Sequence, residues 1–292
     1  MDGIIIIDKP SGDTSFSLVK KLQTLTGEKV GHAGTLDPLA SGVLPICIGR
    51  ATRLVDYIMA GEKEYFVDAV FGTTTDTEDR LGTTLIQKAA DFTYSELESL
   101  LQKFIGDIMQ TPPMYSAIKK NGKRLYELAR SGIEVERDAR AVKISQLELL
   151  SLKNGDHPRA KLRVVCSKGT YMRTLCKDIG DALGCGGHMA ELRRTRCGKF
   201  DIKNSVPLNM IEDKADAAKY LISMDSAIDF MPRVKVPQDL IKKVLTGQTI
   251  PKNAFSDIPD SSVLALFDAF GNFIAIAQNQ DNIKPIKVFS NG

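Results

Sequence analysis

Asp37 is the residue of this sequence whose surroundings best suit it for chemistry. It lies within residues 31–42 (GHAGTLDPLASG), a stretch too rich in glycine to form a long regular element. Pro38 biases Asp37 toward an extended backbone, so the carboxylate is expected to project from a fixed loop, where it could act as a nucleophile or a base. The alternative is structural, because Asp followed by Pro also begins short helical turns with Asp as the N-cap. Local chemistry alone favours that alternative.

A second group of carboxylates, Asp76, Glu78 and Asp79, lies in the polar stretch of residues 73–82. It could be a metal loop or an acid and base pair. Its spacing matches no complete calcium-binding loop, so a solvated turn is the favoured interpretation. Cys185 and His188 suggest zinc, but no second pair follows at finger-like spacing, and no metal site is predicted.

The composition is that of an ordinary globular protein. The 292 residues, 43% of them hydrophobic, are enough for one large domain and one small one. The five cysteines are scattered and no signal-like segment precedes them, so we expect a cytoplasmic protein with reduced thiols. No apolar run approaches the roughly 20 residues that a membrane helix requires.

Basic residues gather in two tracts, although the net charge is only +3. Residues 119–143 contain eight basic and four acidic side chains, and residues 159–199 contain ten basic and three acidic ones. Tyr126 and Tyr171 lie within these tracts, and Tyr115 lies just before the first. Cations and aromatic rings together can contact phosphates and stack on bases, so these tracts suggest contact with RNA.

Hydrophobic periodicity and turn residues predict the elements that position these groups. Residues 64–72 alternate as a strand whose inward face begins with Tyr65, and a helix is expected from Thr14 or Ser15 to Gly27. The proline within residues 43–48 favours a strand at an edge or with a bulge. The remaining predictions are strands at 3–8, 142–152, 160–166 and 188–200, helices at 51–59, 93–105, 125–130 and 169–183, and short strands from about residue 230 onward.

The sequence resembles the bacterial tRNA pseudouridine synthase B family. The run GHAGTLDPLASGVLPICIGRATR is similar to the family signature, and Asp37 stands at the position of its catalytic aspartate. Further family-like segments follow in the expected order over most of the first two thirds of the chain, whereas the last third matches loosely. These segments are DKPSG from Asp8, KEY from Lys63, FGTTTD from Phe71, PPMYSA from Pro112, KGTYMR from Lys168 and LRR from Leu192.

The resemblance implies an α+β fold. Its core would be a mixed, mostly antiparallel sheet of the pseudouridine synthase type with flanking helices, followed by a small β-rich C-terminal domain similar to PUA domains. We expect the catalytic domain at residues 1–230, with an RNA-facing insertion at about residues 110–140. The PUA-like RNA-binding domain is expected at residues 231–292.

The implied activity is isomerisation of uridine to pseudouridine at position 55, in the T-loop of tRNA, on a nucleotide flipped out of its stack. The resemblance makes Asp37 the catalytic residue, which attacks C1′ or deprotonates C2′, and makes Arg173 the charged partner that keeps it ionised. The same resemblance assigns four residues to substrate binding. Tyr65 would stack on the base and take the C5 proton, Leu192 would line its pocket, His32 would contact extruded nucleotides, and Lys9 would support the site.

The resemblance implies no cofactor and no metal. The expected partner is tRNA, through its T-arm stem-loop, with no membrane, no obligate protein partner and a monomeric state. Two other functions stay open: a non-catalytic protein that binds or folds tRNA, and a glycosidase-like hydrolase that pairs Asp37 with Asp76 or Asp79. Product analysis separates the three, because they yield isomerised uridine, unchanged RNA or free base.

Overall fold

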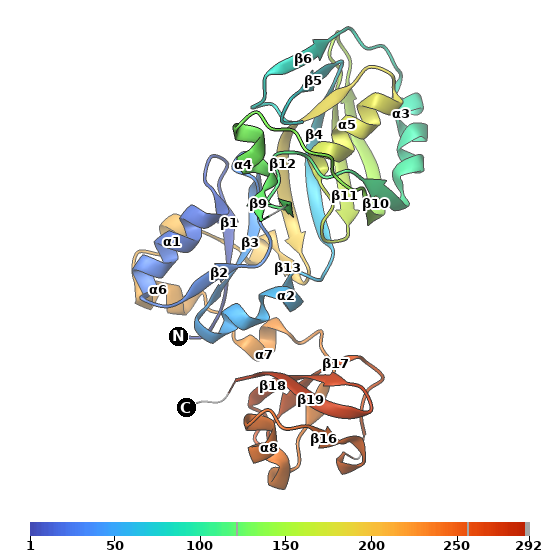
Figure 1. Ribbon diagram of the computed structural model, residues 1–292. Coiled ribbons are helices and arrows are strands. Elements are labelled where there is room, and N and C mark those ends of the chain that lie inside the picture. Colours follow the sequence, from blue (N-terminus) through green and yellow to red (C-terminus); the bar gives the residue numbers. More distant parts are fainter. Residues whose placement is uncertain (121, 256, 290–292) are drawn as a thin grey trace.

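A ten-stranded mixed sheet forms the larger part of the computed structural model, which describes residues 1–120, 122–255 and 257–289 (Figure 1). Asn121 of the predicted basic loop, and residues 256 and 290–292 of the predicted C-terminal domain, lie outside the described residues. The strand order is β14 (Val206–Pro207), β1 (Gly3–Lys9), β3 (Ser41–Ile48), β12 (Gly187–Cys197), β4 (Lys63–Phe71), β11 (Arg159–Cys166), β10 (Arg140–Lys153) and β7 (Gly106–Gln110), with β2 (Val30–His32) on β3 and β13 (Phe200–Asp201) on β12.

Most neighbours in this sheet are antiparallel, and β12 meets β3 in parallel only at Arg193 and Arg194, which face Ser41 and Gly42. The consecutive isoleucines of β1 are buried on both of its faces, as an interior strand requires. The strand β4 alternates as predicted, with Tyr65 directed to the buried side. The predicted α+β class with a mostly antiparallel core is confirmed.

Three helices supply apolar side chains to the core on the Tyr65 side of the sheet: α1 (Ser15–Thr26), α3 (Tyr94–Leu101) and α5 (Met172–Ala182). Thr14 caps α1 and Gly27 ends it at φ 69°, as predicted. The predicted start of α5 at Gly169 is wrong, because Gly169 is left-handed at φ 85° and the helix begins at Met172. Shorter helical segments are η1 (Gly49–Leu54), α2 (Val55–Ile58), η2 (Gln102–Phe104), α4 (Leu125–Arg130), η3 (Ile202–Asn204), η4 (Leu208–Met210), α6 (Lys214–Lys219) and α7 (Met224–Ala227).

The prediction that Pro45 marks an edge or a bulge is wrong. The strand β3 is interior, with β1 on one side and β2 and β12 on the other, and Pro45 faces Ile6 in an unbroken register. The carbonyl of Pro45 accepts from Ala33 N at 2.8 Å, on the side away from β1. Because the nitrogen and the carbonyl of a strand residue point to the same side, the proline nitrogen also faces Ala33, and no hydrogen bond to β1 is lost. The Cys197 thiol donates instead to the carbonyl of Ala33.

Two hairpins extend from the sheet. One joins β5 (Thr73–Thr75) to β6 (Thr84–Gln87) and includes the predicted carboxylate turn. The other joins β8 (Lys119–Lys120) to β9 (Lys123–Arg124) and continues into α4, so the basic segment between β7 and β10 is a hairpin followed by a short helix.

A separate five-stranded sheet lies at the C-terminal end of the chain (Figure 1). Its order is β15 (Arg233–Lys235), β17 (Val263–Phe267), β18 (Phe273–Asn279), β19 (Asn282–Val288) and β16 (Ile250–Pro251), with η5 (Gln238–Leu240), α8 (Ile241–Leu245) and η6 (Lys252–Ala254) between strands. A small β-rich C-terminal unit is therefore confirmed. Phe267 and Phe289 of this unit share one apolar cluster with Ile4 and Ile58 of the larger part, and the boundary at residue 230 stays a prediction.

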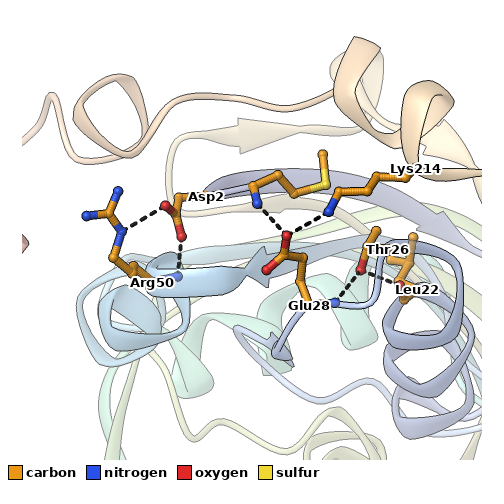
Figure 2. Close-up of polar contacts among 7 residues, drawn as sticks. Asp2, Leu22, Thr26, Glu28, Arg50 and Lys214 are labelled. Carbon is orange, nitrogen blue, oxygen red and sulfur yellow. Dashed lines mark hydrogen bonds and ion pairs between the residues drawn. The ribbon is translucent and has the colours of Figure 1, made fainter. Parts of the chain in front are cut away.

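Ion pairs fix the beginning of β1 (Figure 2). Both carboxylate oxygens of Asp2 accept from Arg50, one from its backbone N at 2.6 Å and one from its Nε at 2.8 Å. Glu28 Oε1 lies 2.5 Å from the amino nitrogen of Met1 and 3.0 Å from Lys214 Nζ. The strand that leads to Lys9 is thus tied to η1, to the chain after α1 and to α6.

Gly42 offers a test of how tightly β3 and β12 approach. It has φ 106°, and a Cβ there would lie 2.1 Å from the carbonyl oxygen of Arg194. We expect Gly42→Ala to lower the free energy of unfolding by about 3 kcal/mol or more, measured by urea denaturation, because strain and overlap add. Gly27→Ala is the control, since Gly27 has φ 69° and open space around it, and should cost about 1 kcal/mol. Equal costs would contradict the close approach.

Candidate active site

Asp37 occupies a turn rather than a helix N-terminus. The amide of Ala40 donates to the carbonyl of Asp37 at 3.0 Å, and no helix begins at Pro38, so the capping alternative is wrong. The side chain of Asp37 is 35% exposed and can meet a ligand.

Two buried cations hold the backbone around Asp37. Lys9 Nζ donates to the carbonyls of Pro38 at 3.2 Å and Ala40 at 2.7 Å, and also to that of Pro10 at 2.8 Å. Arg194 donates to the carbonyls of residues on both sides of the turn, which are Gly34 at 2.8 Å, Thr35 at 3.5 Å and Val43 at 2.7 Å. The loop therefore has its backbone acceptors satisfied from the protein interior.

Side chains and backbone of the segment after β1 complete this support. Ser15 Oγ donates to the carbonyl of Leu36 at 3.0 Å and accepts from its amide at 2.9 Å. Ser11 Oγ donates to the carbonyl of Leu39 at 2.8 Å, and the Gly12 amide donates to that of Pro38 at 2.8 Å. The DKPSG segment thus supports the loop, and Lys9 is placed to hold its backbone.

Arg173 faces Asp37 from the first turn of α5. Its Nε lies 2.9 Å from Asp37 Oδ2, and its side chain is only 5% exposed. Nη1 donates to the carbonyl of Thr77 at 3.3 Å and Nη2 to that of Tyr115 at 2.9 Å. The guanidinium is fixed by main-chain acceptors on both sides, so its ion pair with Asp37 has a defined direction.

Asp79 corrects the prediction of a solvated turn at residues 73–82. It is 6% exposed, and its Oδ2 lies 4.0 Å from Arg173 Nε. Thr77 Oγ1 at 2.8 Å and the Leu81 amide at 3.0 Å donate to its other oxygen. Glu78, between Thr77 and Asp79, has φ 62° and is the one non-glycine residue with positive φ in the described part of the chain. This turn brings both the carbonyl of Thr77 and the carboxylate of Asp79 to the guanidinium of Arg173.

Tyr65 and Leu192 lie on the neighbouring strands β4 and β12, each 8% exposed. In the register between these strands Tyr65 faces Arg194 and Val67 faces Leu192. Burial raises the pKa of Tyr65 to about 12, and the positive charge of Arg194 works against that rise. The sheet therefore places the phenol close to the cation that holds the Asp37 loop.

His32 ends β2, directly before the loop, and faces Ile46 of β3. Its Nδ1 is buried, and no hydrogen-bond partner for it exists among the residues that the structure describes. Burial lowers the pKa of His32 and the charge of Arg194 lowers it further, so both favour the neutral ring.

Sequence reasoning gave Tyr171 no role beyond an aromatic among basic residues. The side chain of Gln110 bonds both main-chain groups of Tyr171, accepting from its amide at 3.0 Å and donating to its carbonyl at 3.3 Å. Burial raises the pKa of Tyr171, Ser116 and the charge of Arg173 oppose the rise, and the charge of Asp37 adds to it. Its position two residues before Arg173 was the signal that could have found it.

Cys185 and His188 make no metal centre. His188 Nδ1 lies 2.9 Å from the carbonyl of Thr73, and the Cys185 thiol donates to backbone carbonyls. Within residues 1–120, 122–255 and 257–289, no group of three His, Cys, Asp or Glu side chains is arranged to hold a metal ion. In the same ranges no helix is long and apolar enough to cross a membrane.

Solved structures share this fold over nearly the whole chain. The crystal structure of a Cbf5-Nop10-Gar1 complex matches with a TM-score of 0.72 and 28% identity, covering 99% of this chain and 84% of that one. The structure of an H/ACA RNP bound to a substrate RNA containing 2′-deoxyuridine matches with a TM-score of 0.73 and 24% identity, covering 99% and 85%. The architecture is that of the pseudouridine synthases, with a PUA-like C-terminal unit.

Sequence comparisons agree. Residues 20–172 match the N-terminal domain of the TruB family pseudouridylate synthases, and residues 173–229 match the tRNA pseudouridylate synthase B C-terminal domain. The tRNA pseudouridine synthase B of Clostridium kluyveri is 42% identical over 99% of this chain and 100% of its own length. That of Stutzerimonas stutzeri is 43% identical over 95% and 92%. The chain belongs to the TruB family of pseudouridylate synthases, and the predicted resemblance and enzyme class are confirmed.

The contact between Asp79 and Arg173 predicts different roles for the two aspartates of the turn. We expect Asp79→Asn to lower the rate of pseudouridine formation at saturating RNA by at least about tenfold, because a neutral amide leaves the guanidinium less firmly directed at Asp37.

Asp76→Asn is the matched control. Asp76 is exposed and accepts from the Thr83 amide at 2.8 Å, which an amide oxygen can still do. Its rate should stay within about twofold of the parent, and equal losses in the two variants would contradict the assignment.

Proposed function

We propose that the chain converts a uridine of tRNA to pseudouridine at position 55 of the T-loop, with Asp37 as the reacting carboxylate. Relatives that match almost the whole chain carry the name tRNA pseudouridine synthase B, which supports tRNA as the substrate class. The observation that carries the proposal is the 2.9 Å ion pair between Asp37 Oδ2 and Arg173 Nε in a fold of this family.

The reaction needs a carboxylate that a nucleotide can reach and that stays ionised. Asp37 is 35% exposed, whereas Arg173 behind it is 5% exposed. The guanidinium therefore faces the carboxylate from the protein interior and leaves it open to a nucleotide. Asp37 then attacks C1′ or removes a proton from C2′, and the electron pair of the C1′–N1 bond leaves with the uracil.

The freed uracil anion turns, and its C5 bonds to C1′. On the first path this displaces the Asp37 carboxylate and breaks its ester bond to C1′, and on the second path C2′ takes its proton back from Asp37 as the C1′–C2′ double bond opens. Loss of the C5 proton then re-forms the C5–C6 double bond, the electron pair of the C6–N1 double bond moves to N1, and N1 takes a proton. Tyr65 would stack on the base and, as a phenolate, accept the C5 proton. Leu192 would give the base an apolar wall against which it can turn, and His32, neutral and half-buried, would contact the extruded nucleotides.

Two other functions fit the geometry less well. A hydrolase with two carboxylates would need a second acid across the scissile bond from Asp37, but Asp79 is buried and directed at the same guanidinium. Asp76 is exposed and bonded within its own turn. A protein that only binds or folds tRNA would not need the ion pair between Asp37 and Arg173.

The RNA would be held by the basic insertion and by the C-terminal unit. Lys119, Lys123 and Arg124 are exposed on the β8–β9 hairpin, and the guanidinium carbon of Arg124 lies 5.8 Å from the ring centroid of Tyr126. We assign the T-arm stem-loop to the insertion and the active site, and the rest of the tRNA to the PUA-like unit. The protein would act as a monomer in the cytoplasm, where its buried free cysteines stay reduced.

Asp37→Asn tests the reacting group. The amide keeps the shape of the side chain but is neither nucleophile nor base, so we expect tritium release from C5 of uridine-labelled tRNA to fall to background while tRNA affinity stays within about threefold. Release near the parent rate would remove Asp37 from the mechanism. Inactivity of the parent protein on tRNA would remove the proposed function itself.

Salt dependence tests the insertion. Changing Lys119, Lys120, Lys123 and Arg124 to Gln together should weaken tRNA binding and flatten the plot of log affinity against log salt, by about 0.7 to 0.9 for each phosphate that is no longer neutralised. The reaction rate at saturating tRNA should persist. The control changes the exposed Lys203 and Lys219, far from the insertion in sequence, to Gln, and should leave the slope unchanged. An unchanged slope in the fourfold variant would place the phosphate-binding residues elsewhere.

A further inference from the structure

Arg194 is a buried cation without an anionic partner. It lies in β12, is 1% exposed, and is among the largest fully buried side chains of the protein. Three hydrogen bonds join it to backbone carbonyls, and it forms no ion pair with any carboxylate in the part of the chain that the structure describes. Removing such a charge from water costs several kcal/mol of folding free energy even after relaxation. A neutral hydrogen-bond donor could support the same carbonyls at a smaller cost, so a purely structural role does not explain the charge.

The bonds of Arg194 bracket the reacting carboxylate. Its Nη2 and Nη1 donate to Gly34 and Thr35 on the entry side of the loop, and its Nε donates to Val43 on the exit side. A planar guanidinium holds these acceptors in one fixed arrangement, which an ammonium group cannot do. Arg194 therefore joins both ends of the Asp37 loop to β12 through one side chain.

Arg194 also lies against Tyr65. The two residues face each other in the register of β12 and β4, on the same side of the sheet. Burial raises the pKa of Tyr65 to about 12, and the Arg194 charge opposes this. The same charge acts, after burial, to lower the pKa of His32. The unpaired charge thus reaches the groups around the loop.

We propose that Arg194 is a positioning residue for the isomerisation, one that holds the Asp37 loop at both ends and whose unpaired charge, lying beside Tyr65 across the strands, makes proton acceptance by that phenol less unfavourable than burial alone would make it. The second part rests on the proposed role of Tyr65 as acceptor of the C5 proton. Substitutions can separate the loop-holding role from the electrostatic role. Lysine keeps the positive charge but lacks the planar guanidinium, whereas glutamine lacks both.

The experiment compares Arg194→Lys, Arg194→Gln and a control, Arg163→Gln. Arg163 faces Phe66 on β4, so it lies on the opposite side of the sheet from Tyr65. Each protein is made with 3,5-difluorotyrosine at position 65, whose phenol ionises at lower pH, and its ionisation is followed by ¹⁹F NMR without RNA. Rate at saturating tRNA and tRNA affinity are measured on the same variants with the natural tyrosine.

Both substitutions should lower the rate at saturating tRNA, by about a hundredfold for Arg194→Gln, with tRNA affinity within about threefold of the parent. The ionisation midpoint at position 65 should rise in Arg194→Gln and stay near the parent value in Arg194→Lys. Arg163→Gln should change neither quantity. If Arg194→Gln does not fold, Arg194→Lys decides: a reduced rate with retained affinity supports the loop-holding role, and an unchanged rate overturns it.

An unchanged midpoint in Arg194→Gln would overturn the electrostatic part. The same loss of rate and of affinity in every Arg194 variant, with no change in the titration, would reduce Arg194 to a folding residue. An inactive parent protein is a different result, because it contradicts the proposed function while the titration still reports on Arg194.

Discussion

The central constraint in this structure is the need to satisfy the backbone carbonyls of an irregular loop that cannot satisfy itself. Residues 34–40 form neither helix nor strand before β3 begins, and the carbonyls in and beside this stretch need donors from elsewhere. Lys9 from β1 and Arg194 from β12 donate hydrogen bonds to these carbonyls. The close pairing of β12 with β3 at Gly42, where a Cβ would lie 2.1 Å from the carbonyl oxygen of Arg194, brings the Arg194 side chain beneath the turn.

This solution has an electrostatic consequence. Lys9, Arg173 and Arg194 lie at or beneath the loop, and all three are almost fully buried. Within the described residues, the carboxylates that form ion pairs with these cations are Asp37 and Asp79, both with Arg173. Burial lowers the pKa of Lys9 to about 8, with Asp13 and Asp37 acting in the opposite direction. A surplus of buried positive charge is unfavourable for folding, but it would suit the proposed reaction, in which the site binds a phosphodiester and releases an anionic base.

The parts of the site that could be predicted were those fixed by local chemistry or by family pattern. Thr14 and Gly27 bound α1 because capping is decided within a few residues. Asp37 and Arg173, 136 positions apart in the sequence, could be paired only through resemblance, and in the structure Arg173 Nε lies 2.9 Å from Asp37 Oδ2. The burial of Asp79 beside Arg173 was not predicted, because no residue near Asp79 in the sequence indicates that contact.

Pro45 shows the same limit from the other side. A proline within a strand usually indicates an edge, because its nitrogen cannot donate a hydrogen bond to a neighbouring strand. Here the nitrogen of Pro45 faces Ala33, and the carbonyl of Ala33 accepts from the thiol of Cys197. That arrangement depends on a residue more than 150 positions away. Pairing partners of this kind are set by the whole sheet, so no window of sequence around the proline contains them.

The apolar cluster that joins the two sheets limits how freely the chain could be recombined. Ala33, at the entry to the Asp37 loop, belongs to the same cluster as Phe267 and Phe289 of the C-terminal unit. Arg53 and Lys287 reinforce the contact, since Lys287 Nζ donates to the carbonyl of Arg53 at 2.7 Å and the Arg53 guanidinium lies 5.0 Å from the ring of Phe289. A C-terminal unit exchanged from a relative would therefore have to bring an inner face that packs against this cluster, whereas its outer surface could differ without disturbing the contact.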